Sequence, residues 1–91
     1  MATSDVSATL AERGSRYGRF ADQAEYAQAL NDVASRSPNF SKMRASQREA
    51  IRIIFNKLGR ILNGDVDYSD SWHDIAGYAL LVDAELKAEG K

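Results

Sequence analysis

Residues 64–78 read Gly-Asp-Val-Asp-Tyr-Ser-Asp-Ser-Trp-His-Asp-Ile-Ala-Gly-Tyr and hold four aspartates with the only Trp and the only His of the chain. The stretch joins two segments, 46–63 and 69–89, in which apolar residues recur at helical spacing. Asn63-Gly64 is typical of a helix end at which glycine takes the left-handed conformation. Because the connection from Gly64 to Tyr68 is short, we expect an antiparallel helical hairpin.

Each helix of this hairpin has a predicted start and a predicted apolar stripe. Ser46-Gln-Arg-Glu49 has the form of a capping box, which places the first start at Ser46. The stripe that follows is Ile51, Ile54, Phe55, Leu58, Ile61 and Leu62. The stripe of the second helix is Trp72, Ile75, Ala76, Ala79, Val82 and Leu86. We expect the stripes to face each other, with Trp72 as the packing anchor.

The rest of the chain also indicates helices. A first helix is expected to begin after Thr3 or Ser4 and to end in the segment from Gly14 to Gly18. A second spans about 22–35 and ends before Ser37-Pro-Asn39, because proline disfavours helix in the residue before it. The predicted fold is therefore all-α: one domain, residues 1–91, forming a small bundle of three to four helices.

Composition narrows the function classes. With 12 Lys+Arg against 13 Asp+Glu there is no broad basic footprint, which argues against a nucleic-acid partner. The absence of cysteine excludes disulfides, thiolate chemistry and cysteine-based zinc sites. No apolar run approaches the roughly 20 residues of a membrane span, so we expect a cytoplasmic protein without a membrane partner. At 91 residues the core is modest, which favours a homo-oligomer, a dimer or larger.

The candidate ligand-binding residues are aromatic or cationic: Arg16, Tyr17, Phe20, Lys57, Arg60 and Tyr78. Tyr17 and Phe20 lie among arginines and glycines, a composition that suits a phosphorylated aromatic ligand. Lys57 and Arg60 are three residues apart on one helix and could hold phosphate. In the alternative interpretation the aromatic residues cap the end of the bundle and the cations are simply solvated.

The candidate metal ligands are carboxylates. Asp70 and Asp74 are four residues apart, so they share a helix face about 6 Å apart and could hold Mg²⁺ together with Glu49. Alternatively, Asp70 complements a helix dipole and Asp74 forms a surface ion pair. One histidine without cysteine argues against zinc, and no nucleophile-and-base set or Gly-rich phosphate loop is present. Unless the magnesium hypothesis holds, we expect no cofactor.

Each long helix also carries an aliphatic residue on its polar side, Ile53 in one and Leu81 in the other. A fully solvated surface does not need them, so we expect another helix or a partner chain to cover part of each. Gly77 within a helix costs roughly 1 kcal/mol relative to alanine, which predicts a close backbone approach at that position.

Four motifs, in this order, resemble a family of small proteins of tailed phages and prophages that carries no established activity. They are Arg16-Tyr-Gly-Arg-Phe20, Gln47-Arg-Glu-Ala50, Lys57-Leu-Gly-Arg-Ile-Leu-Asn-Gly64 and Asp70-Ser-Trp-His-Asp-Ile-Ala-Gly-Tyr78. The last motif, through Asp74-Ile-Ala-Gly-Tyr-Ala-Leu-Leu81, is also similar to the final helix of MazG-like all-α NTP pyrophosphohydrolases, in which acidic pairs on two helices bind Mg²⁺. That family has acids three residues apart, whereas Ser71 stands three residues before Asp74.

These observations lead to one main functional hypothesis and two alternatives. The main hypothesis is a non-catalytic phage or prophage accessory protein that binds a host protein or a nucleotide-like ligand, for example in counter-defence. The first alternative, implied by the MazG-like resemblance, is a Mg²⁺-dependent nucleotide pyrophosphohydrolase that uses Glu49, Asp70 and Asp74. Facing apolar stripes would, however, turn Glu49 and Asp74 away from each other. The second alternative is a purely structural helical module.

Overall fold

The computed structural model describes residues 2–91, with side chains from residue 6 onward. The elements are α1 (Ala2–Tyr17), α2 (Phe20–Ser35), the short 3₁₀ helix η1 (Phe40–Lys42), α3 (Ala45–Asn63) and α4 (Ser69–Ala88). These described residues contain no strand, which confirms the predicted all-α class. No helix among them combines the length and the apolar character that crossing a lipid bilayer requires.

The helix bounds follow the predicted ones closely. The starts and ends of α3 and α4 agree within one residue, and α2 begins two residues earlier than expected. Thr3 and Ser4 lie inside α1, and their side chains are outside the described part of the chain. Of the two glycines expected to end the first helix, only Gly18 does so. Its φ is 75°, and its N–H donates to the Gly14 carbonyl at 2.9 Å.

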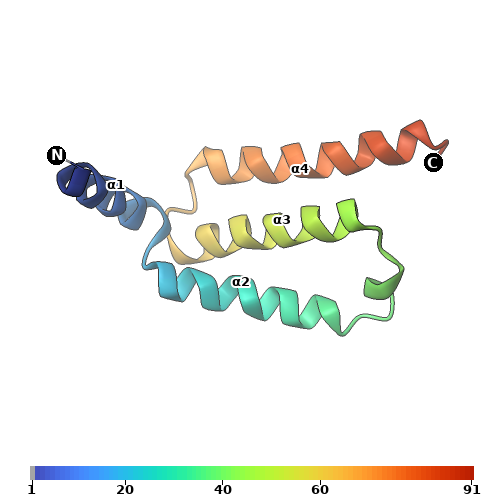
Figure 1. Ribbon diagram of the computed structural model, residues 1–91, viewed down its shortest axis with the longest axis horizontal. Coiled ribbons are helices and arrows are strands. Elements are labelled where there is room, and N and C mark those ends of the chain that lie inside the picture. Colours follow the sequence, from blue (N-terminus) through green and yellow to red (C-terminus); the bar gives the residue numbers. More distant parts are fainter. Residues whose placement is uncertain (1) are drawn as a thin grey trace.

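Three helices lie side by side with α3 in the middle (Figure 1). α2 and α4 flank it on opposite sides and both run antiparallel to it, whereas α1 projects from one end of this layer (Figure 1). Ala50 of α3 is directed toward α4, while Gly59 approaches the Gln23 carbonyl and Ala27 of α2. Ala50 and Gly59 are nine residues apart, half a turn on the helical wheel, so α3 uses opposite sides for its two neighbours.

The predicted packing of α3 against α4 through their apolar stripes is wrong. The residues of α4 on the side of α3 are Ser71, Asp74, Tyr78, Val82 and Glu85, of which only Val82 belongs to the predicted stripe, and their mean direction is about a quarter turn from that stripe. Trp72 is not a packing anchor: it is 52% exposed, and its indole donates to the Val66 carbonyl at 3.0 Å. Polar contacts, rather than two facing apolar stripes, therefore contribute much of the α3–α4 contact.

The stripes remain together on one side of the layer. Because α2 and α4 both run antiparallel to α3, the helical wheel places the apolar stripe of each helix on the same side. We call this the apolar side; it comprises Tyr26, Leu30 and Val33 of α2, Ile51, Ile54, Leu58 and Leu62 of α3, and Trp72, Ile75, Ala79 and Leu86 of α4. The buried apolar residues of the described chain are few and mostly small: Ala27, Ala50 and Ile61.

The start of α3 is held differently from the predicted capping box. The N-cap is Arg44, whose backbone N–H donates to Gln47 Oε1 at 3.0 Å. An arginine side chain has no acceptor, so it cannot return the second bond of the box. The Ser46 hydroxyl, which was expected to cap the helix, donates to Glu85 of α4 at 2.9 Å.

Arg44 also fastens the start of α3 to the end of α4. Its guanidinium donates to Glu85 at 2.9 Å and to Glu89 at 3.0 Å. Hydrogen bonds from Arg44, with a second one from Ser46 at Glu85, lower the pKa of both carboxyls. The same bonds raise the pKa of Arg44. The carboxylates are thus held in their charged form at neutral pH.

The turn after α3 is hydrogen-bonded to the end of α1. Asn63 donates to the Tyr17 and Arg19 carbonyls at 2.9 Å, and the Asp65 N–H donates to the Arg16 carbonyl at 2.7 Å. Gly64 does not take the predicted left-handed conformation, since its φ is −137°. A β-carbon there would fall 2.5 Å from Tyr17 Cα and closer still to the Arg16 carbonyl oxygen. Glycine is needed for close approach rather than for its φ.

Candidate functional site

An arginine–tyrosine cluster joins the end of α1 to the end of α3 and to the turn before α4. Its members are Arg13, Arg16, Tyr17, Arg60 and Tyr68. The guanidinium carbons of Arg13 and Arg60 lie 5.4 and 4.5 Å from the centre of the Tyr17 ring. That of Arg16 lies 4.2 Å from the centre of the Tyr68 ring, and the two rings meet edge to face at 6.0 Å. These are favourable cation–π and aromatic distances.

The cluster gathers three positive charges and few negative ones. Arg16 Nε lies 3.5 Å from Glu12 Oε1, longer than a well-formed hydrogen bond. Within residues 6–91, neither Arg13 nor Arg60 forms an ion pair with a carboxylate. The Nε atoms of Arg16 and Arg60 are buried without a hydrogen-bond partner in that part of the chain. The cluster therefore keeps a local positive charge on Arg13 and Arg60, which suits an anion.

A hollow of about 250 Å³ borders the cluster between α1 and α2. It is lined by Leu10, Arg13, Gly14, Tyr17, Gly18, Phe20 and Gln23. Two predicted ligand-binding residues, Tyr17 and Phe20, thus share one hollow, and Phe20 is 76% exposed. An aromatic ring placed here would meet apolar walls and the Arg13 guanidinium.

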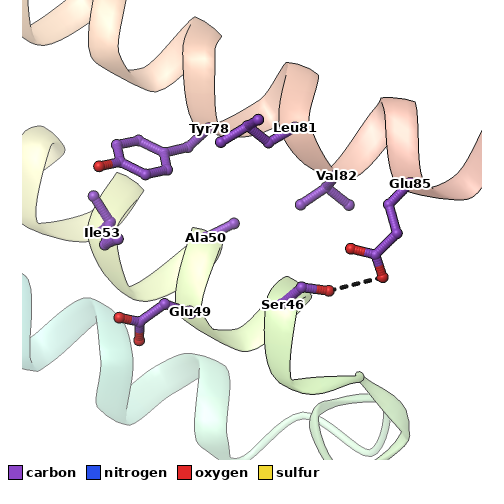
Figure 2. A pocket seen from close by; sticks show the side chains of 8 residues that line it. All are labelled: Ser46, Glu49, Ala50, Ile53, Tyr78, Leu81, Val82 and Glu85. Atoms are coloured by element: carbon purple, nitrogen blue, oxygen red, sulfur yellow. Dashed lines mark hydrogen bonds between the residues drawn. The ribbon is translucent and has the colours of Figure 1, made fainter.

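The other predicted residues lie along α3 and α4. Lys57 Nζ is 3.1 Å from Asp74 Oδ2, and the lysine side chain is only 15% exposed. Tyr78 lines a groove of about 220 Å³ between the two helices. In Figure 2 its ring lies near Ile53, and Leu81 and Val82 line the α4 side of the groove. The carboxylates Glu49 and Glu85 border an otherwise largely apolar hollow.

The groove explains why the polar sides of the two long helices carry the aliphatic residues Ile53 and Leu81. Ile53 and Leu81 line it together, so the helices of the chain itself bring them near each other, although Leu81 stays 66% exposed. The predicted backbone approach at Gly77 is wrong for this chain. A β-carbon built there meets no atom within 4 Å.

The structure places the three candidate metal ligands with separate partners. Glu49 accepts two hydrogen bonds from Arg52, at 2.9 and 2.7 Å, and these lower its pKa. Asp70 accepts from the Tyr68 hydroxyl at 2.8 Å, a bond that raises the pKa of Tyr68. Asp74 pairs with Lys57, which lies eight residues, or about 12 Å of helix, beyond Glu49. Among the described residues no three His, Asp or Glu side chains form a group that could hold a metal ion.

Glu49, Lys57, Arg60, Asp70 and Asp74 nevertheless share a side of the layer, which we call the polar side. The quarter-turn rotation brings the polar sides of α3 and α4 next to each other, as the Lys57–Asp74 pair and the groove lined by Glu49 and Tyr78 indicate. The arginine–tyrosine cluster adjoins this side through Arg60.

Sequence reasoning missed two members of the cluster, Arg13 and Tyr68. Arg13 precedes Tyr17 by four residues, so helical spacing places both on one face of α1, and this signal was available. Tyr68 reaches the cluster only because the turn before α4 meets the end of α1, and no local pattern indicates that contact.

Comparison with protein-family models, with curated proteins and with solved structures gave no match to this chain. The resemblances to small phage proteins and to MazG-like enzymes therefore stay predictions.

Proposed function

We propose that the chain is a non-catalytic binding protein, phage- or prophage-encoded, that recognises a phosphorylated aromatic ligand such as a nucleotide. The observation that carries the proposal is the convergence of Arg13, Arg16 and Arg60 on the rings of Tyr17 and Tyr68. Guanidinium groups bind phosphate through paired N–H donors, and exposed aromatic rings stack on bases.

The hollow beside Tyr17 supplies the second half of such a site. Phe20 and Tyr17 offer ring surfaces for a base, while Arg13 stands at the same hollow and Arg60 on the same tyrosine. In this arrangement the base lies between α1 and α2 and the phosphates extend toward the guanidinium groups. Counter-defence is one setting in which a phage protein would sequester a nucleotide signal.

The direct test is thermal unfolding of the protein with a panel of nucleotides and with inorganic phosphate. A ligand present at ten times its dissociation constant stabilises the folded state by about 1.4 kcal/mol. For a domain of this size that raises Tm by roughly 6–11 °C. We expect a shift with at least one nucleotide, a smaller shift with phosphate, and loss of the shift in Arg13→Gln and Arg60→Gln.

Arg52→Gln is the matched control, because Arg52 is an exposed arginine of α3 whose partner is the neighbouring Glu49. It should keep the full nucleotide shift. No shift with any nucleotide would remove ligand binding from the proposal.

The hydrolase alternative is tested in the same samples. No observation favours it, since Glu49, Asp70 and Asp74 each have a different partner. With Mg²⁺ and an NTP or dNTP panel we expect no pyrophosphate release. Release that disappears in Asp74→Ala, with the helical circular dichroism unchanged, would establish the enzyme instead.

A further inference from the structure

Within residues 2–91 no element covers the apolar side of the three-helix layer. Four of its members are largely exposed: Tyr26, Val33, Leu62 and Trp72. The others are half-buried except for Ala79, and the nearest charged side chain on the helical wheel is Asp83 of α4, which pairs with Lys87 at 2.9 Å. α1, the one helix outside the layer, projects from its end (Figure 1). Large apolar residues gathered in an exposed position on one side of a soluble protein are typical of an interaction site.

The chain exposes more surface than a compact monomer of the same mass. The accessible surface is 6463 Å², where a compact monomer of 10.0 kDa would expose roughly 5200 Å². The surplus of roughly 1200 Å² includes surface of the projecting helix α1 as well as the open apolar side (Figure 1), and it exceeds the roughly 800 Å² that each partner loses in a stable interface of standard size. The radius of gyration is 15.7 Å against roughly 12 Å for a compact chain of this length, an elongation to which the projecting α1 contributes.

We propose that a second copy of this chain covers the apolar side, so that two layers pack face to face about a two-fold axis. A stable domain needs two packed layers around a hydrophobic core, and one chain provides only one layer. In a two-fold interface each copy offers the same surface, so the apolar residues of this side would meet the same apolar residues of the second copy.

The arrangement leaves the proposed ligand site free. The polar side lies on the opposite surface of each layer, so the dimer carries two arginine–tyrosine clusters facing outward. The inference is independent of the proposed function: binding and dimerisation use different sides and can fail separately.

A dilution series of the unmodified protein tests the dimer. Sedimentation equilibrium should give twice the chain mass, falling to 10.0 kDa on dilution. Trp72 is the only tryptophan, so its emission reports on this surface alone and should shift to the red over the same concentrations. A mass of one chain at every concentration up to about 1 mM would overturn the proposal, because an interface of this size should be populated there.

Two matched substitutions then locate the interface. Leu62→Glu puts a charge on the apolar side, at a residue 60% exposed in the single chain, and should weaken dimerisation about 100-fold or more because the charge enters twice. Leu81→Glu makes the same change at an equally exposed leucine of the polar side and should leave dimerisation unchanged. Equal weakening by both variants would show that the dimer uses another surface and would overturn the assignment.

Discussion

Two glycines of the C-terminal half, Gly64 and Gly77, differ in what surrounds them. A side chain at Gly64 would collide with the backbone of Arg16 and Tyr17, whereas one at Gly77 would meet nothing within 4 Å. We therefore expect Gly64→Ala to destabilise the fold by about 1–3 kcal/mol. Gly77→Ala should stabilise it by about 1 kcal/mol, because alanine is the better helix former. Urea unfolding of both variants measures this, and a shift of the same sign in both would contradict the structure.

The glycines also show which structural roles of a single residue can be predicted from the sequence. The sequence predicts correctly that α3 ends at Gly64, but it gives the wrong reason, a left-handed φ. The actual reason is the close approach of the Arg16 backbone, nearly fifty positions earlier in the chain. No pattern in the sequence around Gly64 indicates this contact. Gly18, whose role depends on its own φ, was predictable.

At the scale of elements, Arg44 ties the start of α3 to the end of α4 through Glu85 and Glu89. Both carboxyls have a lowered pKa in the fold, so their contribution is present above the unfolded pKa near 4.5 and is lost as pH falls through the folded values. We expect wild-type Tm to exceed that of Arg44→Gln at pH 7 and the difference to shrink between about pH 5 and pH 3. Thermal scans at several pH values measure this, and a difference independent of pH would rule out the ion pairs as its source.

Helix existence and bounds were readable from the sequence because capping and periodicity are local properties. The direction in which each helix packs was not. An apolar stripe indicates which side of a helix avoids water, but not which neighbour provides the cover. In this layer α3 meets α2 and α4 along its edges, through Gly59 and Ala50, and all three stripes are turned to the same open side.

For the whole molecule, the candidate site was predictable in part. Residue types and spacing indicated Arg16, Tyr17, Lys57 and Arg60, and the structure brings three of them into the arginine–tyrosine cluster while pairing Lys57 with Asp74. The predicted burial of Trp72 is wrong because the three helices form an open layer, in which the apolar stripes lie on one side instead of facing each other.

A quarter-turn rotation of α4 relative to the predicted packing separates the polar side of the layer from its apolar side. Nuclear Overhauser spectra, filtered to retain contacts within one chain, test it most directly. We expect cross-peaks from the Tyr78 ring to the methyl groups of Ala50 and Ile53, which line the same groove (Figure 2). Cross-peaks from the Ala76 methyl to α3 in their place would show that the apolar stripes face each other and that the rotation is absent.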